Sequence, residues 1–105
     1  MIKIIDEAQF EGEIKTSDGQ LKIVEFFARW CNPCNMLAPV LEKLAKNYEE
    51  VQIYKIDVDT NSDLANNLNI QSVPTMLFYK NGDILKQVMG LQPMESLEET
   101  IETLK

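Results

Sequence analysis

The pattern of apolar and polar positions along the 105-residue chain changes repeatedly between the two-residue period of strands and the 3.6-residue period of helices. Short runs rich in β-branched and aromatic residues predict strands at 2–5, 21–28, 51–58, 75–79 and 84–89. Apolar residues three and four apart predict helices after Asp6 to about residue 16, at 33–48, around 64–68 and at 94–104.

The order of these elements indicates the fold class. Strands that alternate with helices pair in parallel through helical crossovers, whereas the last two strands are separated only by Lys80-Asn81-Gly82-Asp83. Asn-Gly is the strongest short hairpin signal, so these two strands are antiparallel. We therefore predict an α/β fold with a central mixed five-stranded β-sheet flanked by four helices on both faces.

Length and composition are those of one globular domain spanning residues 1–105. No apolar run is long enough to span a bilayer, and the N-terminus lacks the features of a secretory signal, so we expect a cytoplasmic protein without a membrane partner. The net charge of −7 argues against binding to nucleic acid. The absence of histidine excludes Ser-His and Cys-His dyads and imidazole metal ligands.

Both cysteines, Cys31 and Cys34, lie in the stretch FFARWCNPC, where the second helix is predicted to begin. A metal site would be half complete, because tetrahedral zinc needs about four ligands, and it would have to be shared between two chains. Two inert core cysteines on one side of a helix turn are a second interpretation. A redox pair is the third, and the flanking residues favour it.

The local physics supports the redox interpretation. Pro33 suits the first turn of a helix, where its missing N–H group costs nothing. The partial positive charge and free amide groups of a helix N-terminus stabilise a thiolate, so Cys31 is the predicted nucleophile. Cys34, one turn further along, is the predicted resolving cysteine that releases the mixed disulfide. No metal ligand set and no bound cofactor is predicted.

Several stretches resemble the thioredoxin family. The sequence VEFFARWCNPCNMLAPVLEKLA is similar to its active-site region, and Val73-Pro74-Thr75, FYKNGDIL and Gly90 follow in the same order at similar spacing. The resemblance covers nearly the whole chain, from about residue 7 to residue 104. It implies the thioredoxin fold and a general protein-disulfide reductase that cycles between a Cys31/Cys34 dithiol and a disulfide.

The resemblance also implies a substrate-binding surface and a set of partners. Pro74 would follow a cis peptide bond beside the cysteines, and Val73 would offer its backbone to an extended substrate segment. Gly90, Trp30 and Thr75 would belong to the same surface. The partners would be disulfide-containing protein substrates and a thioredoxin reductase, by family norm a flavoprotein that draws on NADPH. We expect the chain to act as a monomer.

Glu25 is a departure from the family, which usually has Asp at this position. Alternation along the strand places Glu25 opposite Phe26 and within an apolar run, where burial would raise its pKa and make it a possible proton acceptor from Cys34. Lys55, on a neighbouring predicted strand, would modulate that pKa. The alternative is an edge glutamate that reaches solvent.

Two further departures flank the cysteines. Asn32 stands where the typical family member has Gly, and together with the retained Pro33 it would tune the redox potential in a direction that the sequence does not give. Arg29 precedes Trp30 where an acid is frequent, and it could either help to hold the thiolate or be an ordinary surface side chain.

Two other function classes remain open from the sequence. One is a binding module, such as a subunit or chaperone-like clamp, in which the thiols are incidental. The other is an oxidoreductase specialised for one partner or made more oxidising by Asn32. A glutaredoxin-like role fits less well, because the Trp-Cys-x-Pro-Cys motif differs from that family's usual motif.

Overall fold

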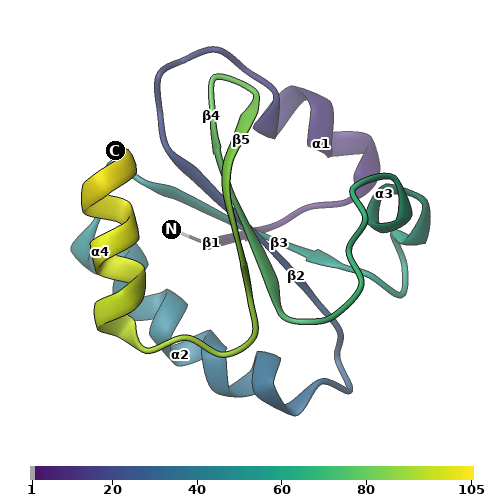
Figure 1. The fold of residues 1–105 in the computed structure, drawn as a ribbon. Coiled ribbons are helices and arrows are strands. Elements are labelled where there is room, and N and C mark those ends of the chain that lie inside the picture. The colour runs from purple at the N-terminus through teal and green to yellow at the C-terminus, as the bar shows by residue number, and fades with distance from the viewer. Residues whose placement is uncertain (1) are drawn as a thin grey trace.

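The computed structural model describes residues 2–105, and Met1 lies outside the described residues. Five strands and four helices alternate as the hydrophobic pattern predicts (Figure 1). In chain order they are β1 (Ile2–Ile4), α1 (Glu7–Ile14), β2 (Lys22–Phe27), α2 (Asn32–Asn47), β3 (Gln52–Asp57), α3 (Ser62–Asn67), β4 (Thr75–Lys80), β5 (Asp83–Met89) and α4 (Met94–Leu104).

The strands form one mixed sheet in the order β1-β3-β2-β4-β5. The pairs β1–β3 and β2–β3 are parallel, whereas β2–β4 and β4–β5 are antiparallel. β2 is therefore the central strand, and its side chains are covered on both faces. The predicted α/β class and mixed five-stranded sheet are confirmed.

Helices cover both faces of the sheet, α2 and α4 on one side and α1 and α3 on the other (Figure 1). The alternation of side chains along β2 and β3 divides the core accordingly. Ile23 and Ile53 pack with the buried leucines of α2 and α4, whereas Val24, Phe26 and Ile56 pack with Phe10 and Ile14 of α1. No helix among residues 2–105 is long and apolar enough to cross a membrane.

The β4–β5 hairpin turns at Asn81 and Gly82, both of which have positive φ angles of 53° and 82°. Its tip is held against the loop that follows α1. The Gly19 amide donates to Asn81 Oδ1 at 2.8 Å, and a Cβ atom added at Gly82 would lie 3.3 Å from the Lys15 carbonyl oxygen. Glycine is required here both by the backbone conformation and by this close approach.

Lys22, at the start of β2, is a buried charge. Its ammonium donates to the Glu13 carbonyl at 3.0 Å and to Thr16 Oγ1, and it pairs with Asp18 Oδ2 at 3.2 Å. These contacts join the sheet to the α1–β2 connection, at the end of the strand opposite the cysteines.

Candidate active site

The candidate site lies where β2 ends and α2 begins. Cys31 is the N-cap residue of α2, and its Sγ accepts a hydrogen bond from the Cys34 amide at 3.2 Å. The Cys31 amide donates to the Ala28 carbonyl at 3.2 Å, which forms a tight turn between the strand and the helix. The chain thus presents its first cysteine sulfur to a free amide at the helix N-terminus.

Cys31 and Cys34 are joined by a disulfide bond, with their Cα atoms 5.3 Å apart. Both cysteines are nearly buried, with exposed fractions of 3% for Cys31 and 2% for Cys34. They cluster with Ala28 and pack against Phe27, Val58 and Val73. Asn32 and Pro33, the residues between them, are exposed.

The segment around Pro74 lies beside the disulfide. The Val73–Pro74 peptide bond is cis, and Cys31 Sγ lies 3.7 Å from the Val73 carbonyl oxygen. The Gly90 amide donates to the Pro74 carbonyl at 2.8 Å, which brings the end of β5 to the same place. The structure therefore gathers Cys31, Val73, Pro74 and Gly90, which are far apart in the sequence.

Gly90 and Thr75 differ in what they present to the surface. Gly90 has a φ angle of 86°, and a Cβ atom added there would meet nothing within 4 Å, so its conformation requires glycine and the space above it is open. The Thr75 side chain is buried and its hydroxyl donates to the Ser72 carbonyl at 2.7 Å. Thr75 thus fixes the turn before Pro74 from inside the protein.

Glu25 lies on the central strand, on the face that α2 covers, and is 0% exposed. This excludes the alternative of an edge glutamate that reaches solvent. Neither carboxylate oxygen has a hydrogen-bond partner among the described residues, and Lys55 Nζ lies 3.7 Å from Oε1. Burial raises the pKa of Glu25 from 4.5 to about 7, and the Lys55 ammonium opposes this effect only in part.

Lys55 is the neighbour of Glu25 in the parallel β2–β3 register. Its Nζ lies 4.8 Å from the centroid of the Phe27 ring, a cation–π contact that keeps the ammonium near both residues. The sequence-based pairing of Glu25 with Lys55 is therefore present as a long ion pair, beyond hydrogen-bond distance.

Two side chains before Cys31 point to partners that the sequence did not indicate. Trp30 is 72% exposed, and its Nε1 donates to Asp59 Oδ2 at 2.9 Å. Arg29 donates through Nε to Asp57 Oδ2 at 3.2 Å. The only clue in the sequence was that Asp57 ends the strand parallel to β2 and Asp59 follows it, because carboxyl ends of parallel strands meet at one edge.

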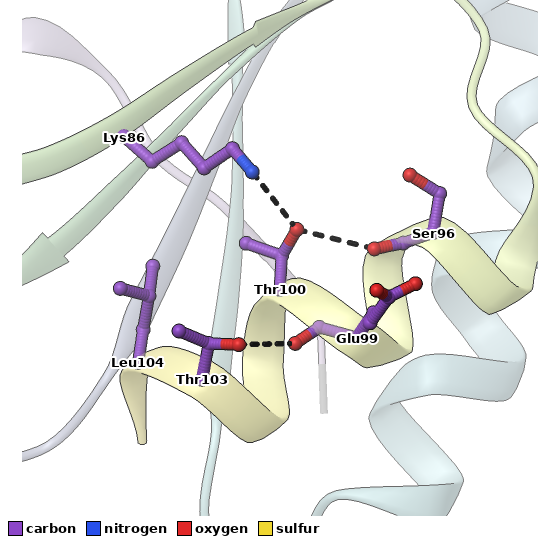
Figure 2. A pocket seen from close by; sticks show the side chains of 6 residues that line it. All are labelled: Lys86, Ser96, Glu99, Thr100, Thr103 and Leu104. Atoms are coloured by element: carbon purple, nitrogen blue, oxygen red, sulfur yellow. Dashed lines mark hydrogen bonds between the residues drawn. The ribbon is translucent and has the colours of Figure 1, made fainter.

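Several hollows lie outside this constellation, among them the following two. In a groove between β5 and α4, the lining side chains are hydrogen-bonded to their neighbours (Figure 2). Lys86 Nζ donates to Thr100 Oγ1 at 3.4 Å, and Thr100 Oγ1 donates to the Ser96 carbonyl at 3.1 Å. A more apolar hollow is lined by Met36, Val40, Leu91, Gln92 and Pro93. Neither contains a predicted site residue, and residues 2–105 contain no group of three or more side chains suited to holding a metal ion.

The family model for thioredoxin matches residues 1–103 of this chain. The chain belongs to the thioredoxin family. A thioredoxin of Staphylococcus aureus is 39% identical over 103 residues, which cover 97% of this chain and 95% of that protein. The structure of the thioredoxin of Malassezia sympodialis (Mala s 13) matches with a TM-score of 0.86 and 33% identity, over 99% of this chain and 90% of that one.

Family membership and the proximal cysteine pair together establish the chemistry. The protein is a thiol-disulfide oxidoreductase of the protein-disulfide reductase type. As a thioredoxin it acts on disulfide substrates and is reduced by a thioredoxin reductase. The predictions of family, fold and reaction class from the sequence are thereby confirmed.

Proposed function

We propose that Cys31 is the nucleophile and Cys34 the resolving cysteine of a general protein-disulfide reductase. The Cys31 thiolate attacks one sulfur of a substrate disulfide, forms a mixed disulfide and releases the other substrate sulfur as a thiolate, which takes a proton from water. Cys34 then loses its proton and attacks Cys31 Sγ, which releases the second substrate thiolate. Two electrons pass to the substrate, and the Cys31–Cys34 disulfide remains.

The hydrogen bond from the Cys34 amide to Cys31 Sγ is the observation that carries this assignment. In the dithiol state the same amide and the positive end of α2 would face the Cys31 sulfur, which favours its thiolate. The Cys34 sulfur has no such helix-end position, because Cys34 lies inside the first turn of α2.

Glu25 is the proposed proton acceptor for Cys34. A pKa of about 7 leaves its carboxyl partly ionised at neutral pH, so it can take a proton and return it to solvent within one cycle. Its position on the sheet face beneath α2, where neither oxygen has a hydrogen-bond partner among residues 2–105, leaves both oxygens available. Lys55 would set the pKa, and Asn32 and Pro33 would tune the stability of the Cys31 thiolate.

The surface around Trp30, Val73, Pro74 and Gly90 is the proposed substrate-binding site, and the predicted Thr75, which is buried, supports it from inside by fixing the turn before Pro74. An extended substrate segment would pair with the Val73 backbone and cross the open space above Gly90. Trp30 offers an exposed aromatic face beside it. Such backbone pairing and apolar contact select extended segments rather than one sequence, in keeping with a general reductase.

The electron donor, the working unit and its location are further parts of the proposal, and the family resemblance supports them. The proposed electron donor is an NADPH-dependent flavoprotein thioredoxin reductase, and the proposed working unit is a cytoplasmic monomer formed by a single domain over residues 1–105. Size-exclusion chromatography with light scattering tests the monomer. Turnover with purified flavoprotein and ferredoxin-dependent reductases tests the donor.

Two matched variants test the roles of the cysteines. Cys34→Ser should still attack a substrate disulfide and should accumulate a covalent mixed disulfide visible by mass spectrometry. Cys31→Ser should form none and should lose insulin reduction. A mixed disulfide that forms on Cys34 in Cys31→Ser would reverse the assignment. Full function of Cys31→Ser in a cellular assay would instead favour a binding module.

A further inference from the structure

Two neighbouring residues before the disulfide are each hydrogen-bonded to an acidic residue at the end of β3, either its last residue, Asp57, or Asp59 in the loop that follows. Arg29 donates to Asp57 and Trp30 donates to Asp59, at 3.2 Å and 2.9 Å. The backbone pairing of the two strands ends with the Val58 amide bonded to the Phe27 carbonyl at 2.9 Å. The two side-chain bonds therefore continue the alignment of β2 with β3 beyond the last backbone bond.

The Asp57 carboxylate contacts both the segment after β2 and the loop after β3. Its Oδ2 accepts from Arg29 Nε, while its Oδ1 accepts from the Asp59 amide at 2.9 Å. The Asp57 side chain is nearly buried and is therefore partly shielded from water and salt, whereas its partner Arg29 is largely exposed. Asp59, the partner of Trp30, is thus fixed through its own backbone by Asp57.

Trp30 depends on this arrangement because little else can hold it. The indole is 72% exposed, and Asp59 is its only hydrogen-bond partner among the described residues. The Arg29 guanidinium is 84% exposed, yet its Nε end is tethered, so the backbone that carries Trp30 is tied down next to the indole. An exposed aromatic side chain fixed before binding loses less conformational entropy when a partner covers it.

We propose that Arg29 and Asp57 are positioning residues that, through Asp59, hold Trp30 ready for protein substrates. This inference rests on the proposed role of Trp30 as a contact for substrates. A protein substrate covers the indole and gains from its fixed orientation. A small aromatic disulfide needs only the Cys31 sulfur and gains nothing from it. The four side chains should therefore affect specificity for large over small disulfides.

The test compares Arg29→Met and Asp59→Ala with variants matched in charge. Lys46→Met and Asp63→Ala make the same charge changes at exposed positions of α2 and α3 outside the hydrogen bonds that join the four residues. Each protein is assayed with insulin, recycled by dithiothreitol, and with 5,5′-dithiobis(2-nitrobenzoate) in single turnover. Trp30 is the only tryptophan, so time-resolved fluorescence anisotropy reports its mobility directly.

We expect Arg29→Met and Asp59→Ala to raise the KM for insulin about 3- to 10-fold and to increase the fast mobility of Trp30. Their rates with the small disulfide should stay within about twofold of the parent, as should all rates of the two controls. Arg29→Lys, whose ammonium can still pair with Asp57, should recover part of the loss.

Unchanged fluorescence anisotropy of Trp30 in Arg29→Met would overturn the inference. Equal losses of the rate of reduction with insulin and with the small disulfide would also overturn it. A lower melting temperature without a change in KM would show a structural role only, which also overturns it. Failure of the parent protein to reduce the small disulfide would instead contradict the proposed function, so the two failures are distinguishable.

Discussion

Strand β2 buries two ionisable side chains three positions apart, and their surroundings are opposite. Lys22, on the face of α1, is hydrogen-bonded to a carbonyl and a hydroxyl and paired with Asp18. Glu25, on the face of α2, has no hydrogen bond among the described residues and only a distant ammonium as its partner. The Lys22 ammonium thus has a partner for each of its three N–H groups, whereas the Glu25 carboxyl has no hydrogen bond among the described residues.

The difference separates a structural charge from a functional one. A buried charge with its hydrogen bonds made fixes the conformation of the chain around it. A buried carboxyl without them keeps a raised pKa and lowers the stability of the fold when it ionises. Such an arrangement is tolerated where the shifted pKa serves the chemistry, which here is the proposed proton transfer from Cys34 to Glu25.

The largest expected effect is on the pH dependence of stability, through Glu25→Gln. The raised pKa of about 7 means that the folded protein keeps a proton that the unfolded chain releases near 4.5. The stability of the parent should therefore fall as the pH rises from 4.5 to 7, and above pH 7 the variant should be more stable by about 3 kcal/mol. Urea unfolding of the oxidised proteins from pH 4 to 8 measures this. If the free energies of unfolding of parent and variant changed with pH in parallel, the raised pKa of Glu25 would be contradicted.

Lys22→Met should lower the stability of the fold, in contrast to Glu25→Gln, and should do so independently of pH. Loss of the ammonium leaves the Glu13 carbonyl and the Thr16 hydroxyl without their partner and should lower the free energy of unfolding by about 1–3 kcal/mol, equally at pH 6 and pH 8. The rate with a small disulfide should not change. Urea unfolding and that rate are measured beside Lys43→Met, an exposed control on α2. A large loss of activity would show that the two buried charges are not separate in function.

Lys55→Met sharpens the interpretation of Glu25. The Lys55 ammonium lowers the pKa of Glu25 against the larger effect of burial, so its removal should raise that pKa above about 7. Less carboxylate would then be present at pH 7, and resolution of the mixed disulfide should slow by less than about tenfold and recover at pH 9. Stopped-flow release of the second product thiol gives the rate. The same slowing in Lys46→Met would point to net charge instead.

The smallest effect should come from Asp18→Asn, the outermost partner of Lys22. Hydrogen bonds from the Gln20 amide and then from Lys22 lower the pKa of Asp18 below its ordinary 3.8. The stability that this carboxylate contributes is present above pH 3.8 and is lost as the pH falls through the lower, folded-state pKa. Asp18→Asn should thus be slightly less stable than the parent at pH 7 and equal to it at the acid end. If the difference in free energy of unfolding between parent and variant were the same at both pH values, the lowered pKa of Asp18 would be contradicted.

The hydrophobic pattern predicted all nine elements, and most of them bury at least one face. β1 and β5 contain no buried residue, so their prediction came from β-branched residues and, for β5, from the Asn-Gly turn before it. The pattern also placed Cys31 and Pro33 at the start of α2, since helix starts have a local signature. The strand order depends on pairing between distant segments, and the pattern alone did not give it. The burial of Glu25 follows from the central position of β2, so the sequence left a solvent-exposed alternative open.

The rest of the site depends on contacts between residues far apart in sequence. Cys31 and Val73 are 42 positions apart, and only the family resemblance suggested that they meet. The bonds from Arg29 to Asp57 and from Trp30 to Asp59 join single side chains across 28 and 29 positions, for which the sequence carries no periodic signal. The sequence therefore allowed Arg29 a role at the thiolate, whereas the structure pairs it with Asp57.

The clamped tip of the β4–β5 hairpin has a consequence for protein engineering. Exposed turns such as Asn81–Gly82 are the usual choice for inserting a foreign peptide. In this chain an insertion there would break the bond from the Gly19 amide and force apart the close approach of Gly82 to Lys15. A designer who wants to display a peptide on this scaffold should therefore choose a turn with no tertiary tether and leave this one intact.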